Sequence, residues 1–272
     1  MTENTDSQRL DSISREVRRN IIEMAYRTKT AHLGPALSIT DLLTVLYFRI
    51  MNIDPTQPNW NDRDRFILSK GHAASALYTI LAHRGYFPVD ELSQYCVDGG
   101  RFHGHPSFGA APGIEFSSGS LGHGLSVGAG IAQGLGSESH AKVYVLLGDG
   151  ECNEGSIWEA AMYAATHRLR NLIALVDRNG FQGFGATTDI HQMNLRVKWE
   201  AFGWNAYEVN GHDLTAIEDQ LRLVATSDRP TVIIADTIAG KGMKAIENTL
   251  LSHYHVPDQA SFEQALKDLY AE

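Results

Sequence analysis

The stretch of residues 143–189 constrains the fold of this chain more than any other part of the sequence. It begins with a continuous apolar run at residues 143–147, which is typical of a parallel strand buried on both faces. A segment with helical periodicity follows at residues 153–167, and a second strand-like run spans residues 172–176. This order predicts an α/β protein with a mainly parallel sheet and helices on both faces.

Two polar side chains directly follow the strands of this unit. Asp149 lies in Gly148-Asp149-Gly150 after the first strand, and Asn179 follows the second. If the strands are neighbours, both side chains lie at the same edge of the sheet. Carboxylate and amide oxygens suit Mg²⁺ or Ca²⁺, which complete their shells with water and phosphate oxygens. From this unit alone, an ordinary α/β loop with a turn Asp and a turn Asn remains an alternative.

The rest of the chain alternates between helical and strand-like segments in the same way. Helices are expected at residues 10–30, 41–51, 72–83, 88–95, 122–136, 193–202, 214–225 and 260–270, and strands at 65–68, 114–118, 206–209 and 231–236. Gly34 and Pro35 are expected to force a loop, and Ser38, Thr40 and Asp41 to cap the helix that follows. No linker, repeat or low-complexity run divides the sequence, so residues 1–272 are expected to form a single domain.

Charge and composition narrow the classes of partner. A net charge of −9 speaks against nucleic acid and anionic membranes, and an anionic ligand would need a neutralising cation. No apolar stretch approaches membrane-spanning length, and residues 1–9 contain no signal-peptide core. Cys96 and Cys152 lie far apart and form no metal or redox pattern. These features predict reduced thiols in a cytoplasmic protein.

Five ordered motifs, spread over residues 10–255, show that the chain resembles the amino-terminal, diphosphate-binding half of transketolase. The motifs are Ala31-His32-Leu33-Gly34, Leu68-Ser69-Lys70-Gly71-His72-Ala73, Gly104-His105-Pro106, Ser117-Ser118-Gly119-Ser120-Leu121-Gly122-His123-Gly124, and the Gly148-Asp149-Gly150 unit with Glu154-Gly155. In that unit, Gly-Asp-Gly is followed after 28 residues by Asn, which is how the thiamine diphosphate motif is written.

The resemblance implies a thiamine diphosphate site with Mg²⁺, for which Ca²⁺ or Mn²⁺ could substitute. By resemblance the metal ligands are Asp149, Asn179 and the carbonyl of Phe181. The implied cofactor-binding residues are His72, Gly119, Leu121, Asp149, Gly150, Glu154, Asn179 and His253. In the family, acidic residues such as Glu154 and Glu159 meet their symmetry mates between two active sites, which implies self-association. A solvated helix face is the alternative for Glu159.

Four of the twelve histidines coincide with family motifs. The resemblance implies that His32, His72, His105 and His253 act on substrate hydroxyls or near the diphosphate, and histidine suits proton transfer near neutral pH. His103 competes with His105 for its role, and His255 competes with His253. The alternative for each is a loop histidine that caps a carbonyl. The other histidines considered are expected to be solvated on helix surfaces or turns: His83, His140, His167, His191 and His212.

Two departures from the family pattern limit what is carried over. Residues 181–185 replace the family's usual stretch after the Asn, and no pyrimidine-binding or carboxy-terminal domain is found in the sequence. The resemblance therefore implies the amino-terminal subunit of a split transketolase. It would transfer a two-carbon ketol unit from a ketose (a phosphate or related acidic sugar) to an aldose, with a separate carboxy-terminal subunit that carries the activating glutamate, as a heterotetramer. The alternatives are a relative acting on another ketose or sulfo-sugar, and a non-catalytic cofactor-binding scaffold or regulatory subunit.

Overall fold

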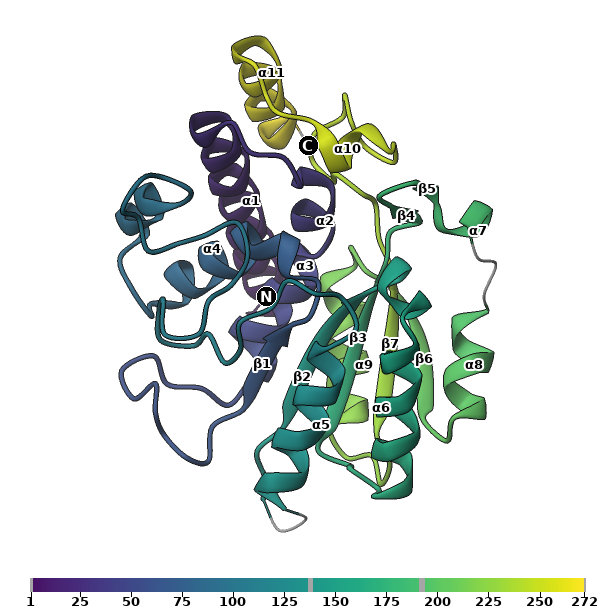
Figure 1. The fold of residues 1–272 in the computed structure, drawn as a ribbon. Helices are drawn as coiled ribbons and strands as arrows, with labels where there is room; N and C mark the ends of the chain where they lie inside the picture. The colour runs from purple at the N-terminus through teal and green to yellow at the C-terminus, as the bar shows by residue number, and fades with distance from the viewer. Residues whose placement is uncertain (1, 137–138, 191–193, 272) are drawn as a thin grey trace.

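A five-stranded parallel sheet forms the centre of the molecule (Figure 1). The computed structural model describes residues 2–136, 139–190 and 194–271. The strand order is β1-β2-β3-β7-β6, and every neighbouring pair is parallel. The strands are β1 (Arg65–Leu68), β2 (Val143–Gly148), β3 (Leu172–Arg178), β6 (Asn205–Asn210) and β7 (Thr231–Asp236). The predicted parallel α/β architecture is confirmed.

Successive side chains of a strand point to opposite sides of the sheet. The central strands are buried on both faces because an apolar core covers each side. Tyr144 and Leu146 pack on one side with the helices that form the larger apolar core, and Val143 and Val145 pack on the other. Each fully buried aliphatic side chain of this kind contributes about 1.5–3 kcal/mol relative to an exposed one. The continuous apolar runs of the sequence are therefore those of strands covered by helices on both faces.

Helices cover both faces, as Figure 1 shows. The larger core involves α1 (Thr2–Thr28), α2 (Leu33–Ser38), α3 (Thr40–Val45), α4 (Ala74–Arg84), α9 (Leu214–Val224) and α11 (Gln259–Tyr270). The smaller core involves α5 (Gly124–Leu135), α6 (Gly155–Thr166) and α8 (Leu195–Ala201). Short helical turns occur at Leu46–Ile50, Gly71–Ala73, Val89–Gln94 and Gly150–Asn153.

The register of the sheet brings the two central loops together. Gly148 at the end of β2 pairs with Asp177 near the end of β3, so the chain leaves both strands at the same level. The amide of Asp149 donates to the carbonyl of Asp177 at 3.1 Å. The expectation that the two strands are neighbours is confirmed.

The segment around Pro35 is helical, so the expected loop there is wrong. Pro35 lies in the first turn of α2, where backbone amides have no partner within the helix and proline therefore costs nothing. The expected caps of the next helix are wrong as well, because α3 begins after Ile39 without a side-chain cap. The hydroxyl of Ser38 donates to Asp177 at 2.8 Å, and that of Thr40 to the carbonyl of Ala36 at 3.3 Å.

The expected strand at residues 114–118 is also absent. The amide of Ser118 donates to the carbonyl of Pro106 at 3.2 Å, and Ser117 accepts from the amide of Phe108, so this segment is bonded to a loop. The structure also contains elements that the sequence did not predict. These are the hairpin of β4 (Phe181–Gln182) and β5 (Gly185–Ala186), and the short helices α7 (Thr187–Ile190) and α10 (Leu251–Tyr254). His191 and Met193 lie outside the described residues.

Both cysteines are free thiols, Cys96 partly exposed and Cys152 buried. Within the described chain, no helix combines the length and the apolar character needed to cross a membrane.

Candidate functional site

The loops that follow β1, β2, β3 and β7 surround a cavity of about 420 Å³. Ligands bind at this edge of parallel sheets because the strand ends converge there. Among the predicted site residues, the lining includes His32, His72, Gly119, Leu121, Asp149, Gly150, Glu154, Asn179, Phe181 and His253. A more open depression of about 550 Å³ beside Asp11 and His212 shares none of its lining residues with this cavity.

Asp149 is held in place by the loops on either side of it. Its carboxylate accepts hydrogen bonds from the amides of Gly150 and Gly180, both at 2.9 Å, and from the hydroxyl of Thr187 at 3.3 Å. Burial and the nearby carboxylate of Asp177 raise the pKa of Asp149 to about 6, although the two amides act in the opposite direction. A bound cation would offset both the burial and the repulsion.

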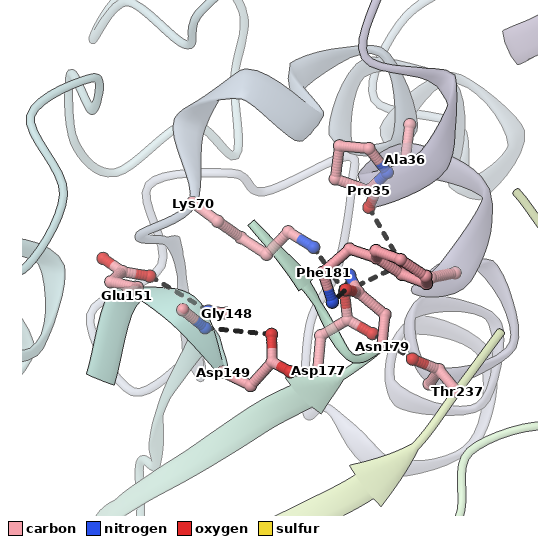
Figure 2. A network of polar contacts seen from close by, with 12 residues as sticks. Pro35, Ala36, Lys70, Gly148, Asp149, Glu151, Asp177, Asn179, Phe181 and Thr237 are labelled. Atoms are coloured by element: carbon pink, nitrogen blue, oxygen red, sulfur yellow. Dashed lines mark hydrogen bonds and ion pairs between the residues drawn. The ribbon is translucent and has the colours of Figure 1, made fainter. Parts of the chain in front are cut away.

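Asn179 lies at the end of the neighbouring strand with its amide group fixed (Figure 2). Its Nδ2 donates to Asp177 Oδ2 at 2.8 Å, and its Oδ1 accepts from the amide of Phe181 at 3.0 Å. One carboxylate and one amide oxygen at adjacent strand ends are hard donors that fit a divalent cation such as Mg²⁺. The described residues contain no group of three or more His, Cys, Asp or Glu arranged to hold a metal. Such a cation would therefore depend on oxygens of a bound phosphate and on water.

The sequence reasoning missed a buried ion pair directly behind these groups. Lys70, at 1% exposure, follows β1 and pairs through its Nζ with Asp177, which is fully buried. Figure 2 shows the Lys70 side chain extending toward Asp177 and Asn179. Lys70 lies within a quoted motif, and Asp177 lies two residues before Asn179. Only the fold reveals that they are partners.

Glu151 was missed too, and it ties three loops together. Its carboxylate accepts from the amide of Gly122 at 2.8 Å, from the amide of Gly148 at 3.0 Å, and from the hydroxyl of Ser69. Burial raises the pKa of Glu151, against the effect of these hydrogen bonds. The carboxylate thus joins the loops after β1, before α5 and after β2 at the lining of the cavity.

Three histidines from separate segments face one another across the cavity. The ring centroids of His32, His72 and His253 lie 5.1–5.5 Å apart in each pair. The amide of His32 donates to the carbonyl of His253 at 3.0 Å. The backbone of His32 has a φ of 71°, which is uncommon for a residue with a side chain and aims the ring inward.

The electrostatics of the three rings keep them uncharged at neutral pH. Burial, followed by the charge of Lys70, lowers the pKa of His72 to about 2. Burial, His32 and Lys70 lower the pKa of His253 to about 4, and burial with His105 lowers that of His32. A neutral imidazole both donates and accepts a hydrogen bond, so these rings can hold or move a proton on a bound hydroxyl.

His105 lies at the rim of the site and does not line the cavity. It is exposed, and its ring would lie 3.7 Å from a side chain added at Gly119, which is part of the lining. The competing histidines His103 and His255 do not line the cavity either. The hairpin after Asn179, where the sequence departs from the family, forms part of the lining, and its Phe184 is 93% exposed.

Two assignments among the other histidines are wrong. His83 is half-buried, its Nε2 lies 2.8 Å from Asn20 Nδ2, and burial lowers its pKa. His212 is not solvated, because its Nδ1 lies 2.7 Å from Asp41 Oδ2 and its Nε2 accepts from the amide of Ile238 at 2.8 Å. Asp41 also pairs with Arg18. Burial alone would raise the pKa of Asp41, but Arg18 and His212 together lower it well below its usual range. Glu159 lies exposed on α6, away from the cavity lining.

Known proteins match this chain over nearly its whole length. The model of the family described as "Transketolase, thiamine diphosphate binding domain" matches residues 11–267. An apulose-4-phosphate transketolase subunit of Actinobacillus succinogenes is 40% identical over 98% of this chain and 98% of its own length. The 6-deoxy-6-sulfo-D-fructose transketolase subunit SqwG of a Clostridium species is 38% identical over 94% of each chain.

Solved structures agree with these relatives. A transketolase from Pichia stipitis in complex with sedoheptulose-7-phosphate superimposes with a TM-score of 0.87 at 28% identity. A transketolase from Leishmania mexicana superimposes with a TM-score of 0.84 at 26% identity. Each match covers 96% of this chain, but only 40% and 45% of those two longer chains, respectively. The chain belongs to the transketolase family and carries that family's thiamine diphosphate-binding domain.

Proposed function

We propose that this chain is the amino-terminal subunit of a two-subunit transketolase, which moves a two-carbon ketol unit from a ketose to an aldose. The observation that supports this most is that two oxygen donors suited to a divalent cation, Asp149 and Asn179, share one cavity with three neutral histidines. Relatives named as transketolase subunits have about the length of this chain, whereas the solved transketolases are more than twice as long. Thiamine diphosphate, when bound, supplies the carbanion chemistry that breaks and forms the carbon–carbon bond.

In this proposal the loops after β2 and β3 hold the diphosphate end of the cofactor. Asp149, Asn179 and the carbonyl of Phe181 bind Mg²⁺, with Ca²⁺ or Mn²⁺ as alternatives, and the metal binds the diphosphate. The cation is needed because the chain is acidic overall. Further contacts to the cofactor come from His72, Gly119, Leu121, Gly150, Glu154 and His253, all of which line the cavity.

The histidines hold and move protons on the sugar. His32, His72 and His253 face one another, so a hydroxyl in the cavity lies within reach of more than one ring. Because these rings are neutral at pH 7, each offers one donor and one acceptor nitrogen to a sugar hydroxyl. His105 is exposed and lies beside Gly119 of the lining, and with His32 it faces the substrate hydroxyls near the reactive carbon.

The proposal includes a separate carboxy-terminal subunit that covers the cofactor and carries the activating glutamate. Relatives that are themselves named as single subunits of a transketolase support the existence of such a partner. Four points stay predictions: self-association through Glu154 and Glu159, assembly as a heterotetramer, a domain organisation limited to the diphosphate-binding unit, and a cytoplasmic location. The sugars named for the relatives carry a phosphate or sulfo group, which favours an acidic ketose as donor.

The test is reconstitution with the product of a neighbouring gene that encodes a carboxy-terminal transketolase half. The mixture, supplied with thiamine diphosphate and Mg²⁺, is assayed with phosphorylated and sulfonated ketoses as donors and an aldose acceptor. Ketol transfer by the mixture supports the proposal. Cofactor binding without transfer, for every partner and donor tried, would favour the scaffold or regulatory role instead.

A further inference from the structure

Asp177 contacts Asp149 and Asn179, two of the three proposed metal ligands, although its own carboxylate does not line the cavity. Its Oδ2 accepts from Lys70, from Ser38 at 2.8 Å and from Asn179 Nδ2 at 2.8 Å. Its Oδ1 accepts from the hydroxyl of Thr237. Through its backbone carbonyl it also accepts from the amide of Asp149 at 3.1 Å. One fully buried residue therefore connects the two strand ends.

The contact with Asn179 decides which end of its side-chain amide points away from Asp177. A carboxylate only accepts hydrogen bonds, so Asp177 can bind the NH₂ group of Asn179 and not its oxygen. The amide of Phe181 only donates, and it therefore selects Oδ1. An amide oxygen has two acceptor positions, so the one not used by Phe181 stays open to a cation. Rotating the amide by half a turn would present NH₂ to the cation and set like groups against both partners.

The ion pair with Lys70 explains why Asp177 is not itself a metal ligand. Lys70 is buried beside it at 1% exposure and supplies the opposite charge. Ser38, Thr237 and Asn179 occupy further acceptor positions of the same carboxylate. A cation at the strand ends therefore meets Asp149 as its carboxylate ligand, while Asp177 acts through Asn179.

We propose that Asp177 is a positioning residue of the metal site: neutralised by Lys70, it holds the oxygen of Asn179 toward the cation and holds the backbone of Asp149. This inference rests on the proposed function, because it concerns the metal that binds the diphosphate. The inference depends on the orientation of the Asn179 side-chain amide. A carboxylate at position 179 offers an oxygen in either orientation, so it would not need Asp177 to select one.

The experiment measures Mn²⁺ affinity of the full chain in the presence of thiamine diphosphate, by loss of the free-Mn²⁺ signal in electron paramagnetic resonance. Asp177→Asn offers Asn179 a group that both donates and accepts, so it is expected to weaken Mn²⁺ binding at least tenfold. Adding Asn179→Asp to that variant is expected to restore affinity to within about threefold of wild type. The matched control is Thr237→Val, which removes a bond to the other oxygen of Asp177 and is expected to change affinity less than threefold.

Asn179→Asp alone is measured as the reference, because an added carboxylate strengthens Mn²⁺ binding by its charge in any background. The inference predicts a larger gain from Asn179→Asp in the Asp177→Asn background than in wild type, and an equal gain in both backgrounds would overturn it. Unchanged affinity in Asp177→Asn would overturn it as well. If Asp177→Asn does not fold, Lys70→Met is added to remove both charges of the buried pair. The same loss and the same rescue are then expected relative to wild type, because Lys70→Met alone would leave the buried carboxylate of Asp177 unpaired. A wild-type chain that binds no Mn²⁺ with the cofactor, alone or with its partner, would overturn the proposed function and this inference together.

Discussion

Protonating the buried histidines of the cavity is costly, and this cost makes stability depend on pH. The pKa values of His72, about 2, and His253, about 4, lie below the ordinary 6.5. Between pH 6.5 and 4 the unfolded chain therefore binds more protons, and the free energy of unfolding falls as the pH falls. The expected slope is on the order of 1 kcal/mol per pH unit for each histidine.

This pH dependence is measured by urea unfolding of the cofactor-free chain at pH 7 and pH 5. Replacing His72 and His253 by Asn is expected to reduce the difference between the two pH values. The exposed His140 is the control, and its replacement by Asn is expected to leave the difference as in wild type. An equal pH dependence in the double variant would show that these rings are not the source.

His32 and His105 are expected to act on substrate more than on cofactor. Their replacement by Ala should lower turnover of the assembled enzyme at least tenfold, because each removes a group that handles a sugar hydroxyl. Cofactor affinity should stay within about threefold of wild type. Titration of the cofactor alongside steady-state kinetics separates the two effects. Normal turnover at saturation with a large loss of cofactor affinity would reverse the assignment.

Asp149 is expected to be needed for metal-dependent cofactor binding and not for folding. Its carboxylate is buried near that of Asp177 with a raised pKa, so Asp149→Ala removes an unfavourable charge from the metal-free chain. Wild-type stability should rise by about 2.7 kcal/mol when cofactor and Mg²⁺ are present at a hundred times the Kd, and the variant should show no such rise. Calorimetry and thermal unfolding measure both effects. The control is Asp189→Ala, at an exposed position. Unchanged cofactor affinity in Asp149→Ala would refute the metal assignment.

Sequence reasoning placed Asp149 and Asn179 at the ends of neighbouring strands, because a local motif marks both residues. It missed Lys70 and Asp177 as a pair because 107 positions separate them, and no local pattern marks their contact. His212 was assigned to the solvent for the same reason, since its partner Asp41 lies 171 positions away. Burial and long-range pairing decide the roles of such polar residues.

Among the elements, the packing of α2 on α10 brings His32 and His253 together. A side chain at Gly34 would place its Cβ 2.3 Å from the hydroxyl oxygen of Ser252 and 2.9 Å from its Cβ. Gly34→Ala should therefore push the two helices apart and destabilise the chain by about 1–3 kcal/mol. Adding Ser252→Gly should recover part of this loss, because it removes both of those atoms.

Chemical unfolding of the two variants measures the effect, and cofactor titration shows whether the histidine cluster is disturbed. A Gly34→Ala chain as stable as wild type would mean that α2 and α10 tolerate a wider spacing. The replacement Gly130→Ala is the control, because a side chain there meets no atom within 4 Å.

Elements were predicted best where the sequence repeats a strong local signal. The apolar runs of β2 and β7 lie where expected because a strand buried on both faces needs them. Residues 114–118 alternate between apolar and polar only over Ile114, Glu115 and Phe116, and in the described structure the amide of Ser118 donates to the carbonyl of Pro106 in a loop. Pro35 was taken as a helix breaker, although proline is tolerated in a first turn. These errors arise from tertiary context, which a local pattern does not contain.

For the whole molecule, the expected behaviour of the isolated chain is weak cofactor binding and no ketol transfer. The cavity is bordered by the exposed Phe184, and the pyrimidine end of the cofactor would have no cover from this chain alone. Adding the partner should strengthen cofactor binding and start turnover, with sedimentation showing two copies of each subunit. Turnover by the purified chain, with mass spectrometry excluding a co-purified partner, would contradict this.

The strand order has a consequence for how the protein is made. β7 is the last strand of the sheet in sequence, yet it lies between β3 and β6. While a ribosome is still synthesising the residues before Thr231, β3 therefore has an unpaired edge and β6 lacks its only neighbour in the sheet. Long-range parallel pairing of this kind forms slowly, and open strand edges invite aggregation in the meantime. Nascent chains are thus most in need of a chaperone just before β7 emerges, and strand ends that hold Asp149 and Asn179 reach their final support only when β7 enters the sheet.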